Sequence, residues 1–404
     1  MSVKKIINLI IFSVVLIGTI QFSSCKNASS SGGSSSSTEN EMLSTPLTFE
    51  ALSNGSIQFN NLSKITGLKY SINNQASVAV NSSAEIQFYE GDTISLFANG
   101  IKNKTDSYVP NDNECFSINC TSDCYIYGNI QSLVFARFEN YRVLPYGTDY
   151  TFRALFKNNT HIKNHPSKKL LLPALKTHEG CYHSMFYGCT SLTSAPELPA
   201  SEFCADSCYN SMFKGCTSLI SAPKLPSTNL ASTCYASMFD GCTSLTSAPV
   251  LPATILAGYC YSSMFKNCTS LVSTPKLPAT TLGKKCYASM FEGCTSLTTA
   301  PILSSTALQE GCYESMFQGC TSLTSAPELS TRVLVRDCYK NMFTGCINLT
   351  YIKCLATNIE ALYCTNNWLK DTKQTGTFVK SKNMNSWTTD TSGIPSGWTV
   401  QEAQ

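Results

Sequence analysis

A nine-residue motif, Cys-Tyr-x-Ser-Met-Phe-x-Gly-Cys, recurs seven times with few changes along the chain. The first step between copies is 27 residues long, and every later step is 26. A fixed period in this range is typical of proteins whose units each pack only on their neighbours. The motif therefore predicts a solenoid. The copies begin at Cys181, Cys208, Cys234, Cys260, Cys286, Cys312 and Cys338.

Each repeat divides into two halves. Residues 184–186, Ser-Met-Phe, and their copies predict a short helical turn, and residues 190–199 predict a short extended segment. In that segment Leu192, Ala195 and Leu198 have the spacing of inward-facing residues on a curved parallel strand. Proline has no N–H to donate, so a proline in every copy predicts short strand ladders. These prolines are Pro196, Pro223, Pro249, Pro275, Pro301 and Pro327.

The segments around the repeats complete the predicted organisation. Alternating apolar residues between 45 and 129, separated by Asn-Gly and similar turns, predict a small all-β domain of the sandwich type. A worn copy of the repeat precedes Cys181, with Thr151 and Asn159 in place of its cysteines. We expect a signal peptide at 1–25, a Ser/Gly-rich linker at 26–42, the β domain at 43–140, the solenoid at 141–364 and a tryptophan-bearing cap at 365–404.

The first 25 residues have the features of an export signal. Two lysines precede an apolar run over residues 6–20, and small residues follow before Cys25. This order is typical of a secretory signal. A cysteine at the cleavage point resembles a bacterial lipobox. It predicts lipid attachment at Cys25, export to the outer membrane and display at the cell surface. An ordinary signal peptide is the alternative.

The repeats and the C-terminus resemble a known family. Met-Phe-x-Gly-Cys-Thr-Ser-Leu, the Leu-Pro-Ala steps at Leu198, Leu251 and Leu277, and the ending Gly-Ile-Pro-Ser-Gly-Trp-Thr-Val are similar to BspA-like leucine-rich-repeat surface lipoproteins of gut Bacteroides-type bacteria. The resemblance implies an α/β solenoid of the leucine-rich-repeat type, with short parallel strands and short helical turns after the all-β domain. It also implies a surface protein that acts in adhesion, without catalytic residues.

The cysteines allow three interpretations. The chain has 21 of them. If Cys25 carries lipid, the other 20 can be buried thiols that fill the core, disulfides formed during export, or metal ligands. The eight-residue spacing within a repeat is not a zinc pattern, so we expect no metal site.

Two further rows of repeated positions are candidates for a surface role. The tyrosines of the motif form an aromatic ladder, either half-buried with the hydroxyl at the surface or exposed as a strip for glycans or proteins. The ladder consists of Tyr182, Tyr209, Tyr235, Tyr261, Tyr287, Tyr313 and Tyr339. A strand row varies while its surroundings stay fixed, as expected of a recognition surface or of a face that only maintains solubility. This row consists of Glu197, Lys224, Val250, Lys276, Ile302 and Glu328.

A third variable row lies on the motif half of the repeat. It consists of Tyr187, Lys214, Asp240, Lys266, Glu292, Gln318 and Thr344. The chain has four histidines and a net charge of +3 from scattered residues, and it shows no phosphate loop or nucleophile elbow. We therefore expect no enzyme, cofactor or nucleic-acid partner. The predicted function is binding or adhesion at the cell surface, through an extended partner such as a host glycoprotein or polysaccharide, with the membrane contacted by the lipid alone. A structural spacer without a specific ligand is the alternative.

Overall fold

The structure is a computed structural model. It describes residues 42–404 apart from 82–83, 105–108, 142, 146, 175, 200 and 385–386. The described residues belong to one compact unit. The predicted signal peptide, with its candidate lipidation site Cys25, lies outside the described residues. None of the helices in the described part has the length and hydropathy needed to span a bilayer.

The N-terminal part contains two sheets, in agreement with the predicted all-β domain. The larger sheet has the strand order β10-β8-β1-β6-β3-β4, with β9 also paired to β8. The smaller sheet has the order β5-β2-β7, and buried residues of both sheets belong to one core. The strands are β1 (Leu47–Ala51), β2 (Gly55–Asn60), β3 (Lys69–Ile72), β4 (Val78–Ala79), β5 (Glu85–Phe88), β6 (Thr93–Phe97), β7 (Ser117–Cys120), β8 (Cys124–Asn129), β9 (Ile162–Asn164) and β10 (Leu170–Leu171).

Helical structure in the described residues is confined to short segments before residue 141. The 3₁₀ segments are η1 (Leu62–Lys64), η2 (Asp112–Glu114), η3 (Ile130–Leu133) and η4 (Phe138–Asn140). The fold is therefore β-rich, and its repeats are built from strands and turns.

The motif half of each repeat is a run of overlapping β-turns, so the predicted helical turn is wrong. In the first copy the amide of Met185 donates to the carbonyl of Tyr182, and the amide of Cys189 donates to that of Phe186. The amide of Phe186 donates instead to the carbonyl of Met212 in the next repeat. Amides thus alternate between closing a turn and joining two repeats, which satisfies the backbone without a helix.

A left-handed backbone conformation at every fourth residue explains this path. Gly180, Ser184 and Gly188 have φ angles of 56°, 53° and 72°. A positive φ at the third position of a turn is what the type II geometry requires. Glycine adopts it without steric cost, whereas serine does not. The helical prediction failed because Ser-Met-Phe gives no local sign that its serine is left-handed.

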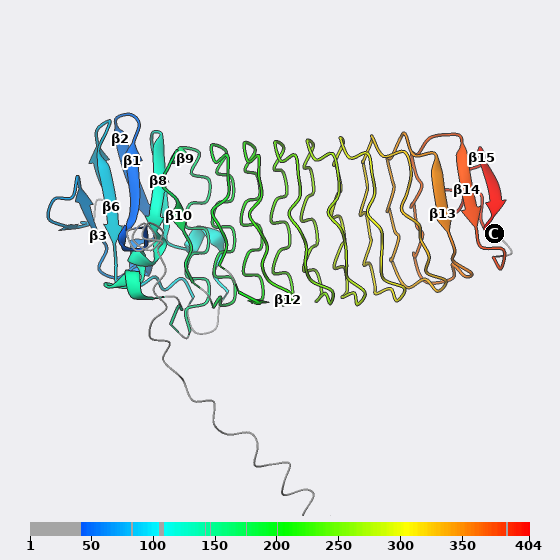
Figure 1. Cartoon of the computed structure of the whole chain (residues 1–404), viewed down its shortest axis with the longest axis horizontal. Coiled ribbons are helices and arrows are strands. Elements are labelled where there is room, and N and C mark those ends of the chain that lie inside the picture. The colour runs from blue at the N-terminus through cyan, green and yellow to red at the C-terminus, as the bar shows by residue number, and fades with distance from the viewer. Residues whose placement is uncertain are drawn as a thin grey trace, which may run out of the picture. The chain divides into compact units, whose positions relative to one another are not determined.

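The extended half of each repeat lies parallel to its copies. Ser194 pairs with Ser221, and Ser221 pairs with Ser247, as isolated parallel bridges. Two-residue strands β11 (Phe203–Cys204) and β12 (Asn229–Leu230) also pair in parallel. Figure 1 shows these repeats following one another side by side between the two sheet-rich ends. The ladders are short, as the recurrent prolines predict.

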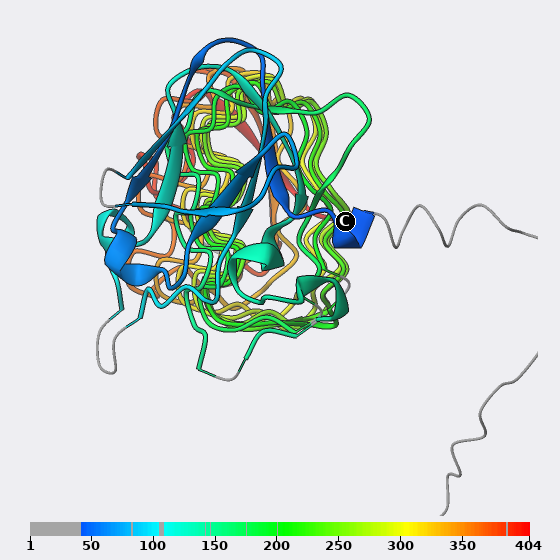
Figure 2. The same cartoon turned by 90° about the vertical axis from the view of Figure 1, so that its left-hand side faces the viewer.

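Stacked side chains fill the space enclosed by each repeat. The rings of Phe186 and Phe213 stack with centroids 5.5 Å apart, and later phenylalanines continue the column. Leu192 is buried, while Ala195 and Leu198 are partly buried and pack against the core. In the end-on view of Figure 2 the backbones of successive repeats overlay one another.

The worn repeat joins the β domain to the first full repeat. The amide of Phe152 donates to the carbonyl of Cys181, and the Phe152 ring stacks on Tyr182 at 5.6 Å. Strand β8 of the β domain pairs in parallel with β9 and β10, which lie between residues 162 and 171. The predicted boundary at residue 140 is therefore crossed by a continuous sheet.

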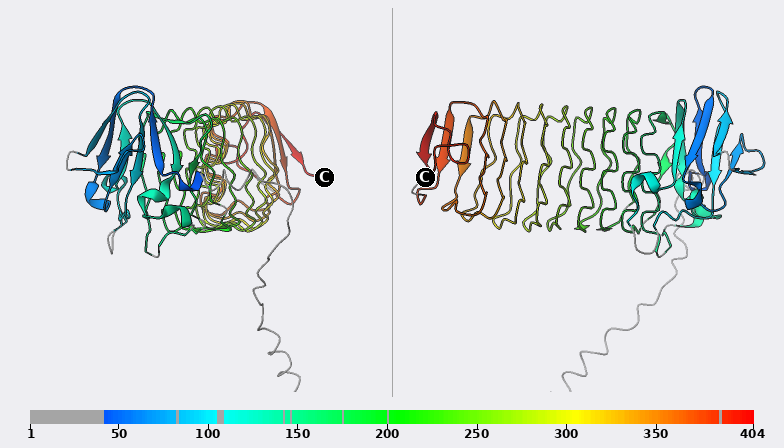
Figure 3. Two further views of the ribbon diagram at one scale, coloured as in Figure 1. Left: turned by 60° about the vertical axis from the view of Figure 1, so that its left-hand side comes forward. Right: turned by 180° about the vertical axis from the view of Figure 1, so that it is seen from behind.

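Three longer parallel strands end the stack, as Figure 3 shows from two sides. They are β13 (Tyr351–Cys354), β14 (Gly376–Lys380) and β15 (Trp398–Glu402), paired in that order. Trp368 continues the tyrosine column at 6.3 Å from Tyr339, and Trp387 stacks on Trp368 at 5.4 Å. The indole N–H of Trp368 donates to the carbonyl of Gly393 at 2.8 Å. Aromatic side chains thus cover the last repeat of the core.

Candidate functional site

The strand row lies on an exposed surface of the repeats. All six of its members are exposed, and the aliphatic side chains of Val250 and Ile302 have relative exposures of 80% and 84%. Each member follows the conserved proline and precedes an inward-facing residue, so the backbone directs it outward in every copy. The row consists of Glu197, Lys224, Val250, Lys276, Ile302 and Glu328.

A second exposed row, which the sequence analysis missed, lies four residues earlier in the same extended segments. Ile220 and Val272 are 54% and 51% exposed, and the other members carry hydroxyl groups. The signal for this row was its variation between threonine and aliphatic residues directly after an invariant leucine. It consists of Thr193, Ile220, Thr246, Val272, Thr298 and Thr324. We call the two rows together the strand face.

Ion pairs occupy the two ends of the strand row. Lys169 Nζ lies 2.7 Å from Glu197 Oε1, and Lys353 Nζ lies 3.1 Å from Glu328 Oε2. These pairs are exposed, and such pairs contribute about 0–1 kcal/mol each. They neutralise both glutamates, so the two acidic members of the row present little net charge to a partner.

The variable row on the motif half carries ion pairs between adjacent repeats. Lys214 Nζ lies 2.9 Å from Asp240 Oδ2, and Lys266 Nζ lies 2.9 Å from Glu292 Oε1. These side chains are buried or half-buried. The charges of this row are therefore satisfied within the stack, which makes the row a poor binding surface.

The tyrosine ladder is part of the core, so both of its predicted interpretations are wrong. Every tyrosine of the ladder is at most 2% exposed, and neighbouring rings stack with centroids 5.5–6.1 Å apart. The hydroxyls of Tyr182 and Tyr261 are buried without a hydrogen-bond partner among the described residues. Consecutive turns place tyrosine beside the inward cysteine, so the whole ring enters the core. The ladder consists of Tyr182, Tyr209, Tyr235, Tyr261, Tyr287, Tyr313 and Tyr339.

The cysteines are buried free thiols, and the described residues contain no disulfide. The second cysteine of each repeat donates its S–H to a phenylalanine carbonyl of the preceding repeat, as Cys216 does to Phe186 at 3.1 Å. In the worn repeat Asn159 replaces this cysteine, and its amide donates to the carbonyl of Ile118. Burial raises the pKa of Cys216 to about 12, which keeps this thiol neutral. No group of three or more potential ligands among the described residues is arranged to hold a metal ion.

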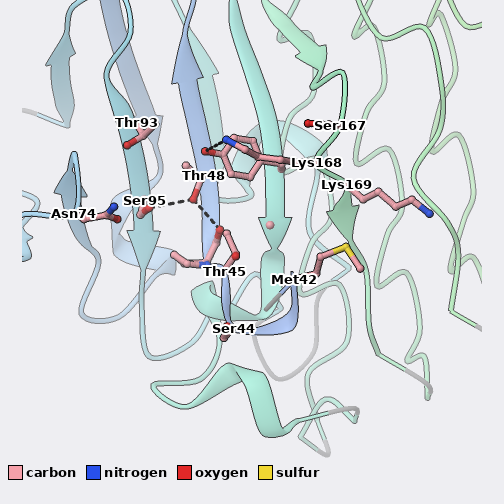
Figure 4. Close-up of a pocket in the computed structure, with 13 residues that line it drawn as sticks. Met42, Ser44, Thr45, Thr48, Asn74, Thr93, Ser95, Ser167, Lys168 and Lys169 are labelled. Atoms are coloured by element: carbon pink, nitrogen blue, oxygen red, sulfur yellow. Dashed lines mark hydrogen bonds between the residues drawn. The ribbon is translucent and has the colours of Figure 1, made fainter. Parts of the chain in front are cut away.

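A cavity of about 580 Å³ lies where the β domain meets the worn repeat. Its lining comes from segments far apart in sequence, which include Thr48, Ser95, Tyr127 and Lys168. Figure 4 shows Thr48 and Ser95 on the neighbouring strands β1 and β6, with Lys168 on the side of Thr48 that faces away from Ser95. The Thr48 and Ser95 hydroxyl oxygens are 3.0 Å apart. The sequence does not predict this junction cavity, because no local motif connects the segments that line it.

The charges at the junction cavity are internally paired. Lys168 Nζ lies 2.9 Å from Glu50 Oε2 and 3.1 Å from the Tyr127 hydroxyl. The hydrogen bond from Lys168 lowers the pKa of Glu50. Burial, together with the charge of Lys168, lowers the pKa of His165, which lies 3.4 Å from Glu50. The charged side chains of Lys168 and Glu50 are therefore paired with each other beside the cavity.

Comparison with known proteins gave no relatives. No family model matches the chain, and neither the curated proteins nor the solved structures contain a match.

Proposed function

We propose that the chain is a surface-displayed binding protein that presents the strand face to an extended partner, such as a host glycoprotein or polysaccharide. The proposal includes a solenoid of the leucine-rich-repeat type, as in the BspA-like lipoproteins that the sequence resembles, and lipid attachment at Cys25. It includes no catalytic role.

One contrast between neighbouring positions carries the proposal. Residues of the repeats that face the core are nearly invariant, whereas the exposed residues of the strand row differ from copy to copy. Val250 and Ile302 are large aliphatic side chains that gain no packing there. Exposed apolar side chains that recur along one face are characteristic of interaction surfaces.

The alternative is a spacer that holds another part of the cell surface at a distance. A spacer needs a stable stack and a soluble exterior, but it does not require exposed aliphatic side chains. The two functions therefore differ in what they predict for substitutions at Val250 and Ile302.

The test is a binding screen of the full chain against glycans and extracellular-matrix proteins, with two matched variants. The V250D/I302D variant changes the strand face. The I255D/V333D variant changes two exposed aliphatic residues in a different row, which pair with Thr281 and Asn358. We expect the first variant alone to lose binding. Binding by neither the parent nor the variants would favour the spacer. Equal loss in both variants would show that binding does not depend on the strand face.

A further inference from the structure

The middle of the strand face alternates with a period of two repeats. Lys224 and Lys276 occupy the strand row in every second repeat, and Val250 and Ile302 occupy it in the repeats between. The second row alternates in the opposite sense, with aliphatic residues in the lysine-bearing repeats and threonine in the others. The two rows therefore define a surface unit that repeats every 52 residues, which is twice the period of the core.

The variable row of the motif half has the same two-repeat period, yet its charges behave differently. There each lysine is followed in the next repeat by an acidic residue, and the two form an ion pair at 2.9 Å. In the strand row, by contrast, the repeat after each lysine carries an aliphatic residue at the same position, Val250 after Lys224 and Ile302 after Lys276. Consequently Lys224 and Lys276 form no ion pair with any residue that the structure describes. Stabilisation of the stack explains the lysines in the variable row of the motif half, but it does not explain the lysines in the strand row.

The spacing of the unpaired lysines restricts the shape of a partner. Neighbouring strands are about 4.8 Å apart, so positions two repeats apart are separated by on the order of 10 Å along the stack. Side chains on one face of an extended peptide recur about every 7 Å, which does not match. A linear chain of pyranose sugars that carries a carboxylate on every second ring repeats its charge at a distance close to that between the lysines.

We propose that the strand face binds an acidic polysaccharide whose negative charge recurs at every second sugar. Lys224 and Lys276 pair with successive carboxylates, while Val250 and Ile302 contact the apolar faces of the intervening rings. The threonines next to them supply hydroxyl groups for hydrogen bonds. This proposal rests on the proposed function and adds the charge and the period of the partner.

The test uses the full chain and four polymers. Hyaluronan carries a carboxylate on alternate sugars, and carboxyl-reduced hyaluronan is its neutral counterpart. Polygalacturonate carries a carboxylate on every sugar, and poly-glutamate is an acidic peptide. The K224Q/K276Q variant removes the two unpaired charges, and K370Q/K373Q, on exposed lysines near the C-terminus, is a control with the same change in net charge.

We expect hyaluronan to bind most tightly, with an affinity that falls as salt rises. K224Q/K276Q should weaken this binding about tenfold, and K370Q/K373Q should leave it unchanged. Equal binding of the carboxyl-reduced polymer through the strand face would overturn the inference and leave the proposed function intact. Preference for poly-glutamate would indicate an acidic protein partner and would also overturn it. If no polymer binds and V250D/I302D alters no interaction found in the screen, both proposals fail.

Discussion

Replacement of Tyr261 by phenylalanine should stabilise the protein. The tyrosine is 1% exposed, and its ring stacks between Tyr235 and Tyr287 at centroid distances of 5.9 and 6.0 Å. Its hydroxyl is sealed in the core without a hydrogen-bond partner among the described residues. Phenylalanine keeps the ring and removes only this hydroxyl.

The magnitude follows from the desolvation of the hydroxyl. A buried polar group without a partner costs about 1–3 kcal/mol, so Y261F should raise the free energy of unfolding by roughly this amount. Y261A removes the ring as well and should lower the free energy by about 3–5 kcal/mol because it leaves a cavity between two stacked rings. The two substitutions at one site thus have opposite predicted signs.

Guanidinium unfolding followed by circular dichroism measures both changes. Y313F is a suitable control, because the hydroxyl of Tyr313 is not among those sealed without a partner; its effect should be smaller. A loss of stability in Y261F would refute the reasoning, since it would mean that the hydroxyl has a hydrogen-bond partner such as an internal water molecule.

Substitutions at two sites and a thiol measurement test the remaining parts of the structure. S263G should raise the free energy of unfolding by about 1 kcal/mol, because residue 263 has a φ of 55° that strains any residue except glycine. S263V should lower the free energy of unfolding in the same assay. D112A should destabilise the protein by about 3 kcal/mol, because it removes the partner of Arg153 and Lys157 at 2.7 and 3.0 Å. Burial opposes ionisation of Asp112, but its bonds to Lys157 and Arg153 lower its pKa overall. The contribution of Asp112 to the free energy of unfolding should therefore be complete above about pH 5 and disappear as the pH falls below about 4. An acid titration of the parent and D112A measures this difference. The native protein should react slowly with a thiol reagent, and denaturation without a reductant should release the 20 described cysteines as free thiols; a count near zero would demonstrate disulfides.

The repeat period and the strand segments could be predicted from sequence, because both depend on patterns that recur. Strands β2, β3, β5 and β6 lie within residues 45–129, where alternating apolar residues predict strands. The predicted exposure of the strand row is also observed, since a proline and a leucine fix the direction of each member.

Other features depend on geometry that the sequence does not state. The left-handed φ of Ser184 turns a helix-like Ser-Met-Phe into a β-turn, and this change moves Tyr182 fully into the core. The role of the second cysteine becomes apparent only when its S–H is seen beside a carbonyl of the preceding repeat. The junction cavity combines residues from 42–48 with residues from 167–169, and only the folded chain brings these together.

The measurement that tests the proposed binding surface most directly is the affinity of proteins with two, four and seven repeats. Each variant keeps the β domain, the worn repeat and the C-terminal strands, and circular dichroism checks that it folds. Because many weak contacts along an extended partner act together, affinity for hyaluronan, or for a glycoprotein found in the screen, should fall in steps as repeats are removed. Affinity that is independent of repeat number, and that is lost in K168A at the junction cavity, would contradict binding along the strand face.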